Sequence, residues 1–172
     1  MENPFAFEVA TPHVLTIDVD QPASQALLVM RDKKIRHLLV TQHERALGVV
    51  SERDLMKALR LEIEDFYSVR VQSTHIDPSL VVRDVMSWPI RFIDEKTVLT
   101  EIVKRIIDEK ISSLIVTQNQ KIVTGIITTE DLLKILQKGL VESGQKEAQS
   151  VMGRLALSPL GEVMKMLSNT GI

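Results

Sequence analysis

Short apolar runs separated by polar loops recur along this chain and predict two pairs of buried strands. Leu38-Leu39-Val40 is followed by Leu47-Gly48-Val49-Val50, and Leu114-Ile115-Val116 is followed by a mainly apolar run from Ile122 to Ile127. These runs are short and rich in β-branched residues, and polar residues bound them. That combination is typical of strands that are buried in a sheet.

Apolar residues at helical spacing predict a helix before and after each strand pair. In front of the second pair, one face carries Ile102, Val103, Ile106 and Ile107, opposite the charged residues Glu101, Lys104, Arg105 and Asp108. The matching face in front of the first pair carries Ala26, Leu27 and Met30. The helices that follow the pairs are indicated by Leu55, Met56 and Leu59 and by Leu132, Leu133 and Leu136.

Each set of elements is preceded by a short extended segment, so the predicted order is β-α-β-β-α, twice. The segments are Val14 to Ile17 and Ile90 to Ile93, each followed by Asp. Pro12 and Pro89 precede them and favour extended backbone at this point. The sequence therefore predicts an α/β (α+β) protein with two units of the same design.

The two units are copies of one another. Residues 34–42 reappear as residues 110–118 with six of nine positions identical, and residues 48–55 are echoed by residues 125–132. The offset is 76 in the first block and 77 in the second, which places one inserted residue in the loop between the strands. Two copies of a unit usually pack about a local twofold axis, so a site made from repeated residues should occur twice near that axis.

The repeat divides the chain into five segments. We expect an N-terminal extension (1–11), a first repeat (12–60), a connector (61–79), a second repeat (80–138) and a C-terminal helical tail (139–172). Asp77-Pro78 and Ser158-Pro159 each resemble a helix start. The apolar stripe of the last helix is expected to pack on this protein's own repeats or on a second copy in a homodimer.

Composition narrows the classes of function. The chain has 172 residues, 44% of them hydrophobic and only 3% aromatic, with a net charge of −2 and no cysteine. A scattered charge pattern without an aromatic platform gives little support to nucleic-acid binding. The absence of cysteine fits a reducing compartment. With no secretory signal pattern and no run of the roughly 20 apolar residues that a membrane span requires, we expect a soluble cytoplasmic protein.

The repeated unit resembles a tandem pair of CBS domains, also called a Bateman module. The resemblance rests on the element order, on the lead-in Val82-Arg83-Asp84-Val85-Met86 and on the blocks Gly48 to Asp54 and Gly125 to Asp131. These blocks match the family's signature of Gly, two apolar residues, Ser or Thr, two variable residues and Asp. Residues 12–138 are covered, with no catalytic or membrane segment beside the pair, as in a free-standing CBS protein.

The resemblance implies clefts between the repeats that bind AMP, ADP, ATP or S-adenosylmethionine; no cofactor is otherwise required. Carried over position by position, the signature aspartates would accept the ribose hydroxyls, and the Ser and Thr would contact phosphate or ribose. Neighbouring extended segments would frame the base. The implied ligand-binding residues are Ser51, Asp54, Thr128 and Asp131, with Arg53, Ile17, His37, Arg91, Ile93 and Ser113 around them.

The same signature also has a purely structural interpretation. Ser-x-x-Asp and Thr-x-x-Asp are close to a capping box, in which the hydroxyl caps the helix and the acid returns to the cap N–H. In the ligand-binding interpretation, free backbone N–H groups at the strand-to-helix junction face a phosphate, and the carboxylate one turn later accepts a ribose diol. Both interpretations can hold for the hydroxyls, so the aspartates distinguish them.

The two copies differ at positions that bear on binding. Arg53 of the first copy corresponds to Glu130 of the second, and Arg53, with Arg36 or Arg91, could meet a phosphate or simply be solvated. No segment before Pro12 matches the lead-in of the second copy, although Phe5-Ala6-Phe7 could take its place. We therefore expect two sites that are not equivalent.

No pattern of an enzyme or metal site stands out. The four histidines lack ligand spacing, and the sequence has no Ser-His-Asp arrangement and no Gly-rich phosphate loop. The first hypothesis is a regulatory module that senses an adenosine-type ligand and transmits its occupancy to an unidentified regulated protein. The alternative is an oligomerisation or protein-interaction module with empty clefts, whose aspartates only cap helices.

Overall fold

The computed structural model describes residues 3–59 and 79–156, and the chain divides into two units, Met1–Thr129 and Glu130–Ile172. The expected helix starts at Asp77-Pro78 and Ser158-Pro159 lie outside the described residues. So does the predicted connector (61–79), except for its last residue.

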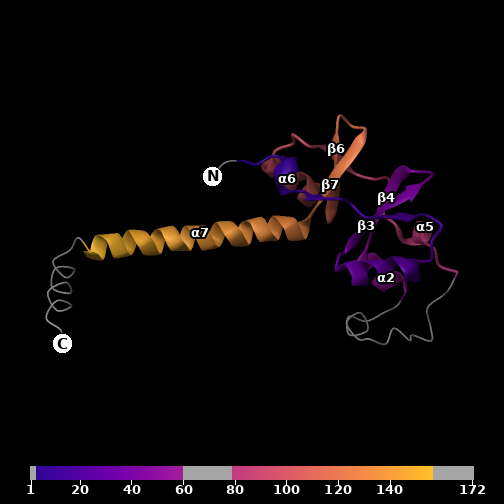
Figure 1. The fold of residues 1–172 in the computed structure, drawn as a ribbon, viewed down its shortest axis with the longest axis horizontal. Helices are drawn as coiled ribbons and strands as arrows, with labels where there is room; N and C mark the ends of the chain where they lie inside the picture. The colour runs from indigo at the N-terminus through magenta and orange to yellow at the C-terminus, as the bar shows by residue number, and fades with distance from the viewer. Residues whose placement is uncertain (1–2, 60–78, 157–172) are drawn as a thin grey trace. The chain divides into compact units, whose positions relative to one another are not determined.

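The first repeat has the predicted β-α-β-β-α order. Its elements are β2 (Thr16–Asp18), α2 (Ala23–Lys33), β3 (His37–Gln42), β4 (Arg45–Ser51) and α3 (Glu52–Ala58) (Figure 1). In the sheet β2-β3-β4, β2 runs parallel to β3 and β4 runs antiparallel to it. The parallel pair requires the α2 crossover, whereas the antiparallel pair is closed by a tight turn.

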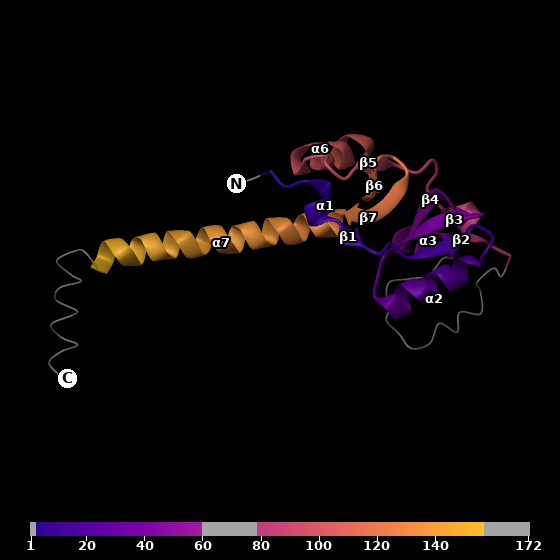
Figure 2. The ribbon, with the colours of Figure 1, turned by 45° about the horizontal axis from the view of Figure 1, so that its top comes forward.

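The second repeat has the same arrangement in the sheet β1-β7-β6-β5. Its elements are β5 (Phe92–Asp94), α6 (Leu99–Glu109), β6 (Ser113–Gln118) and β7 (Ile122–Thr128), with α7 (Thr129–Ala156) beginning directly after β7 (Figure 2). The register repeats as well: Ile17 faces Val40 in the first sheet, and Ile93 faces Val116 in the second. The two-copy architecture is confirmed.

The one-residue difference between the copies lies where the offset predicts it. β3 and β4 are joined by His43 and Glu44, whereas β6 and β7 are joined by residues 119–121. His43 and Glu44 have φ values of 48° and 63°, and Asn119 and Gln120 have values of 51° and 57°. Two successive left-handed residues match the right-handed twist of the flanking strands, so the insertion leaves the sheets unchanged.

Helix α7 supplies most of the described part of the second unit. It is a continuous helix of 28 residues that passes through Gly139 and Gly144. The leucines expected to close the second repeat lie in its first two turns, and Leu133 and Leu136 are exposed. The predicted helical character of residues 139–156 is therefore observed.

Hydrophobic clusters within and between the repeats form the interior of the first unit. The first repeat buries Leu27, Met30, Leu38, Val40 and Leu55, and the second repeat buries Ile102, Ile106, Leu114, Val116 and Ile127 in α6, β6 and β7. A further cluster joins the two repeats, and in it every residue is accompanied by its repeat counterpart: Leu39 and Ile115, Val49 and Ile126, Val14 and Ile90, and Ala46 and Val123. When equivalent residues of two repeats meet in one cluster, the repeats pack about a pseudo-twofold axis.

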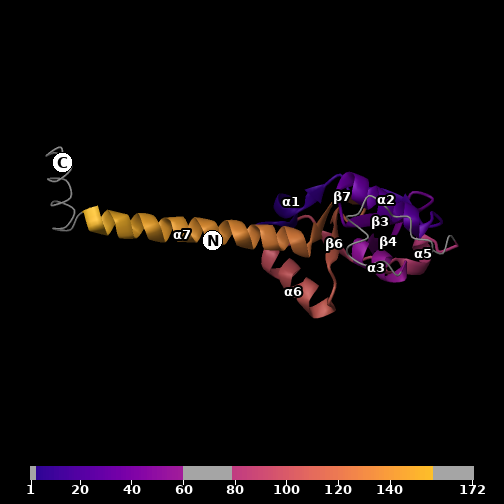
Figure 3. The ribbon, with the colours of Figure 1, turned by 90° about the horizontal axis from the view of Figure 1, so that it is seen from below.

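The lead-in segments of the two repeats are exchanged. Helix α1 (Ala6–Val9) and β1 (Thr11–Pro12) belong to the first copy in sequence but pack on β7 of the second, whereas α5 (Val82–Val85) lies beside α2 and α3 of the first (Figure 3). Ala6 and Val82 are both completely buried. Each lead-in thus completes the core of the other repeat.

Matching backbone hydrogen bonds fix both lead-ins. The Ala6 N–H donates to the Thr97 carbonyl at 2.8 Å, and the Val82 N–H donates to the Gln21 carbonyl at 2.9 Å. Beyond them, β1 pairs with β7, and Ser87 exchanges two hydrogen bonds with Val49 of β4 at 2.8 and 3.2 Å. Each lead-in is thus bonded to the other repeat at equivalent positions.

The first copy does have a lead-in, and the segment that contains Phe5-Ala6-Phe7 takes this place, as the sequence allowed. Phe5 to Val9 is the structural counterpart of Val81 to Val85, and each segment forms a one-turn helix in which an acid, Glu8 or Asp84, accepts a hydrogen bond from the N-cap N–H. The two segments share a buried second residue and this acid, but almost no residue identities, so sequence comparison does not align them.

Glycine at the lead-in contacts gives a test of this packing. A Cβ added at Gly48 would lie 2.6 Å from the Ser87 carbonyl oxygen, and one added at Gly125 would lie 2.9 Å from the Ala10 Cβ. We expect Gly48→Ala and Gly125→Ala to lower the free energy of unfolding by about 1–3 kcal/mol, because neighbouring backbone must move. Urea unfolding followed by the fluorescence of Trp88 measures this directly.

Gly139→Ala is the matched control. A Cβ at Gly139 meets nothing within 4 Å, so alanine should instead favour α7 by roughly 0.5–1 kcal/mol through its helix propensity. Circular dichroism would detect that change. Equal losses of stability in all three variants would contradict the close approach of the lead-ins.

Candidate functional site

An open cleft of about 1040 Å³ is lined by residues of both repeats in the first unit. The first repeat contributes Arg36, His37, Val49 and residues 51–54, 56 and 57. The second contributes its lead-out segment, residues 87–91, together with residues 110–113, 128 and 129. Because the cleft takes walls from both copies, a molecule bound in it would touch both repeats at once.

The end of β4 and the start of α3 place Ser51 and Asp54 in one wall. Ser51 is the N-cap of α3, and its hydroxyl accepts a hydrogen bond from the Asp54 N–H at 3.3 Å. The same hydroxyl donates to Asp54 Oδ2 at 2.5 Å. The cap anticipated by the structural interpretation is thus present, except that the acid engages the cap hydroxyl through Oδ2 rather than the cap N–H.

Equivalent backbone hydrogen bonds fix the floor of the cleft in both copies. The Glu52 N–H donates to the Arg36 carbonyl at 2.9 Å, and the Thr129 N–H donates to the Ser112 carbonyl at 3.0 Å. At the cleft, His37 Nε2 of the first repeat lies 3.3 Å from Ser112 Oγ of the second. The two halves are therefore in direct polar contact at the cleft.

Glu52 is the titratable group in the cleft whose environment shifts its protonation. Partial burial raises the pKa of the Glu52 carboxyl above its ordinary value, and the nearby Arg36 guanidinium opposes that shift. Burial disfavours the charged form of a carboxylate, so the effect of burial exceeds the attraction of Arg36. The ionised form of the Glu52 carboxyl itself is to that extent disfavoured.

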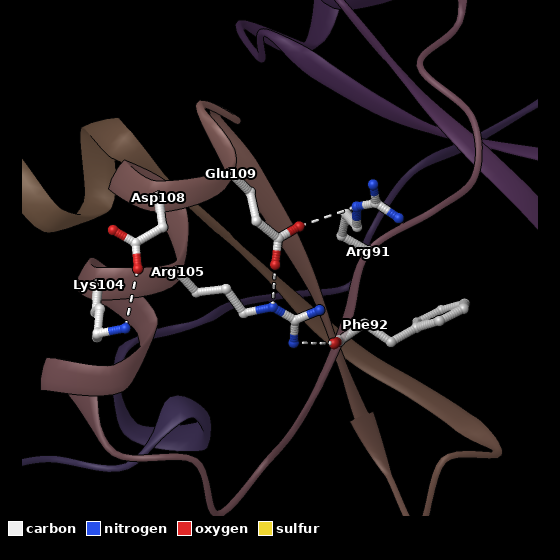
Figure 4. A network of polar contacts seen from close by, with 6 residues as sticks. All are labelled: Arg91, Phe92, Lys104, Arg105, Asp108 and Glu109. Atoms are coloured by element: carbon white, nitrogen blue, oxygen red, sulfur yellow. Dashed lines mark hydrogen bonds and ion pairs between the residues drawn. The ribbon is translucent and has the colours of Figure 1, made fainter.

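Arg91 enters the cleft as part of a network with α6. Its Nε lies 3.0 Å from Glu109 Oε2, and the other Glu109 oxygen accepts from Arg105 Nε at 2.6 Å (Figure 4). Arg105 also donates to the Phe92 carbonyl at 2.8 Å. The hydrogen bond from Arg105, helped by Arg91, lowers the pKa of Glu109. A charged Glu109 therefore holds Arg91 from one side.

Most of the residues singled out from the sequence lie in the cleft. Its lining includes Ser51, Arg53, Asp54, His37, Arg91, Ser113 and Thr128. Ile17 and Ile93 instead lie in the interior of their own repeats, with 8% and 4% of their surface exposed, and are not among the lining residues. Asp131 lies in the first turn of α7, in the second unit.

Sequence reasoning did not single out Trp88 and Lys110. Trp88, the single tryptophan of the chain, lines the cleft with 70% of its surface exposed. The signal available in the sequence was the single Trp of a chain with only 3% aromatic residues, next to the lead-in of the second copy. Lys110 carries no such signal in the sequence. It is the left-handed C-cap of α6, and its counterpart Lys34 is the left-handed C-cap of α2.

The cleft is not symmetric. Residues 87–91 of the second copy line it, whereas their counterparts 11–15 are absent from this lining among the described residues. Arg36 and His37 of the first copy face Ser112 and Ser113 of the second, so the basic groups of this strand edge come from one side. In the described part of the chain, no group of three or more potential metal ligands gathers, and no helix is both long and apolar enough to cross a membrane.

Comparison with known proteins agrees with this architecture. The family model for the CBS domain matches residues 6–61 and 82–138, including the N-terminal lead-in. An uncharacterized protein of Methanopyrus kandleri is 30% identical over 131 residues, which cover 74% of this chain and 60% of that protein. The chain thus spans less than two thirds of the length of this relative.

Two solved structures show the same fold. The CBS domain pair of protein MJ0100, solved in complex with 5′-methylthioadenosine and S-adenosyl-L-methionine, superposes with a TM-score of 0.65 at 16% identity, covering 80% of this chain and 99% of that one. A CBS-domain containing protein of Agrobacterium tumefaciens has a TM-score of 0.61 at 19% identity, covering 76% and 97%.

The shifted pKa values of Glu52 and Glu109 predict how stability changes with pH in variants of these residues. The folded-state pKa of Glu52 is raised, so ionisation of this carboxyl lowers the free energy of unfolding. The loss is absent below the unfolded pKa of about 4.3, where both states are protonated, and it is complete above the raised folded pKa. Relative to wild type, Glu52→Gln should therefore gain stability as the pH rises from about 4 to 7. Urea unfolding at several pH values measures the difference.

Glu109→Gln should change the pH dependence of stability in the opposite direction to Glu52→Gln. The lowered pKa of Glu109 means that its ion pairs stabilise the fold above the unfolded pKa and that this contribution disappears as the pH falls through the folded one. This variant should lose stability relative to wild type toward neutral pH, by a small amount because the pair is solvated. The same pH trend in both variants would contradict the assignment.

Proposed function

This chain belongs to the CBS domain family, and from that premise we propose that it is a regulatory module, rather than an enzyme, whose cleft binds an adenosine-containing ligand. Binding is proposed to change how the two repeats pack and thereby to signal occupancy to a partner protein. The observation that carries the proposal is that one cleft takes Ser51, Asp54 and Thr128 from the equivalent strand-to-helix junctions of both repeats.

Asp54 is proposed as the acceptor of the ribose hydroxyls. Its carboxylate is part of the cleft wall, and Oδ2 already accepts from Ser51 at 2.5 Å. An ionised carboxylate has about four acceptor positions in its two oxygens, so capping of α3 and binding of a diol are compatible. The capping bond then serves to orient the carboxylate instead of competing with the ligand.

Trp88 is proposed as the surface on which the base stacks. The chain is poor in aromatic residues, yet its one tryptophan lies exposed in this cleft. Stacking of a base on an aromatic side chain contributes roughly 1–3 kcal/mol in single-stranded nucleic-acid complexes. The aliphatic side chains of Val49, Ile90 and Ile111 complete an apolar surface of the kind that binds a base.

The packing between the repeats explains how binding could be read by a partner. A ligand that touches both walls favours whichever packing of the repeats binds it better, and its binding energy becomes a change in population. The His37 to Ser112 contact and the cluster around Leu39 and Ile115 are the contacts that such a change would alter. The regulated partner is proposed to recognise one of the two populations.

The alternative function has one observation in its favour. The Ser51 to Asp54 hydrogen bonds show that the signature residues also cap α3, as they would in an interaction module with no ligand. The two functions differ in the response to adenosine compounds: an interaction module gives none.

Ligand-induced stabilisation tests the proposal. AMP, ADP, ATP, S-adenosylmethionine and methylthioadenosine are added to nucleotide-free protein, and the unfolding temperature is followed. A ligand at one hundred times its Kd should stabilise the fold by about 2.7 kcal/mol. Asp54→Ala should abolish most of this shift, because a hydrogen bond to a charged group is worth about 1.5–3 kcal/mol.

Asp108→Ala is the matched control, since Asp108 is an exposed aspartate of α6 outside the cleft. It should retain the full ligand-induced shift. The shift on adding ligand is compared, rather than the unfolding temperature itself, because loss of the bonds to Ser51 destabilises the free protein of Asp54→Ala as well. If no adenosine compound stabilises the wild type, the sensor function is wrong and the interaction module stands.

A further inference from the structure

The charge in the cleft is opposite to that of the whole protein. The chain carries a net charge of −2, yet the cleft is lined by five cationic side chains: Arg36, Arg53, Lys57, Arg91 and Lys110. Its acidic side chains are Glu52 and Asp54. A concentration of one sign in a cleft with low-dielectric walls raises the local potential well above that of the rest of the surface.

Internal pairing removes only part of this positive charge. Arg91 is paired with Glu109, and Arg36 lies near Glu52. Within residues 3–59 and 79–156, Arg53, Lys57 and Lys110 form no ion pair, and all three are exposed.

Arg91 is held in a defined position by its pairing. Glu109 engages its Nε, and Figure 4 shows the two terminal nitrogens on the side of the guanidinium away from Glu109. Arg105 fixes Glu109 from the other side and is itself bonded to the Phe92 carbonyl. The planar guanidinium can therefore present its terminal N–H groups while the pair with Glu109 persists, and this geometry suits bidentate recognition of a phosphate.

We propose that the cleft selects an adenosine ligand that carries a phosphate chain, ADP or ATP, over adenosine compounds without one. This inference rests on the proposed function and names the ligand class for the same cleft. Arg53 and Arg91 contact the phosphates, and Lys57 and Lys110 add to the field. S-adenosylmethionine, with its sulfonium and net positive charge, is repelled, and methylthioadenosine, which is uncharged, gains nothing from the cations.

The selectivity is measured by titrating the wild-type protein, with the fluorescence of the single Trp88 and calorimetry as readouts. ATP and ADP should bind at least about tenfold more tightly than methylthioadenosine or S-adenosylmethionine, since one charge-assisted hydrogen bond accounts for a factor of that size. The preference should shrink as salt is added, because exposed charges are screened. Inorganic tripolyphosphate, which lacks the nucleoside, should bind more weakly than ATP.

Single substitutions then identify the groups responsible. Arg53→Gln and Arg91→Gln should each weaken ATP binding about tenfold and leave methylthioadenosine binding unchanged, whereas Arg53→Lys should retain most of the preference. Lys104→Gln is the matched control, because Lys104 is a cation of α6 that pairs with Asp108 outside the cleft (Figure 4). It should alter neither affinity.

The possible failures are distinguishable. If S-adenosylmethionine or methylthioadenosine binds as tightly as ATP, the phosphate selection is wrong while the proposed function stands. Equal losses for ATP and methylthioadenosine in the arginine variants would also overturn it, since that pattern marks a structural effect. Tripolyphosphate binding as tightly as ATP would refute the adenosine part, and no binding of any adenosine compound would refute both proposals.

Discussion

The structure depends on the exchange of the two lead-in segments. Each one-turn helix buries one residue, Ala6 or Val82, in the core of the other repeat and adds backbone hydrogen bonds to its sheet. Because the two segments cross in opposite directions, neither repeat has a complete core alone. Burying a Val-sized side chain contributes roughly 1.5–3 kcal/mol, a large share of the net stability of a small domain. The facing packing of the sheets around Leu39 and Ile115 follows from this constraint.

The cleft is a consequence of the same packing. Once the sheets face one another about a pseudo-twofold axis, the ends of β4 and β7 are brought to one opening, and with them Ser51 and Thr128. The lead-out after α5 also lines this opening and brings Trp88 and Arg91, whereas the corresponding residues after α1 do not. Near-symmetric packing thus yields an asymmetric, positively charged site, because the two copies differ in side chains much more than in backbone.

Local patterns predicted most of the elements but not how the repeats complete one another. The strand pairs, the helices before them and the inserted residue in the second turn followed from short-range periodicity and a constant offset. The sequence offered Phe5-Ala6-Phe7 as a candidate for the first lead-in but no matching motif, because a buried small residue and an acid three positions after the cap define this segment, and neither requires residue identity. Ile17 and Ile93 were grouped with the site because the family resemblance implied that their extended segments frame the base, but the alternation of a strand turns them inward.

Local patterns in the chain specify the two-copy plan, the order of elements in each copy and the polar signature at each strand-to-helix junction, because these depend on neighbours a few residues apart. Long-range packing specifies which lead-in serves which repeat, which face of the junctions opens to solvent, and that Trp88 and Arg91 join Ser51 and Asp54 around one cleft. Those outcomes are set by contacts between residues that are far apart in the chain. They depend on which apolar surfaces are buried together, and no local pattern encodes that choice.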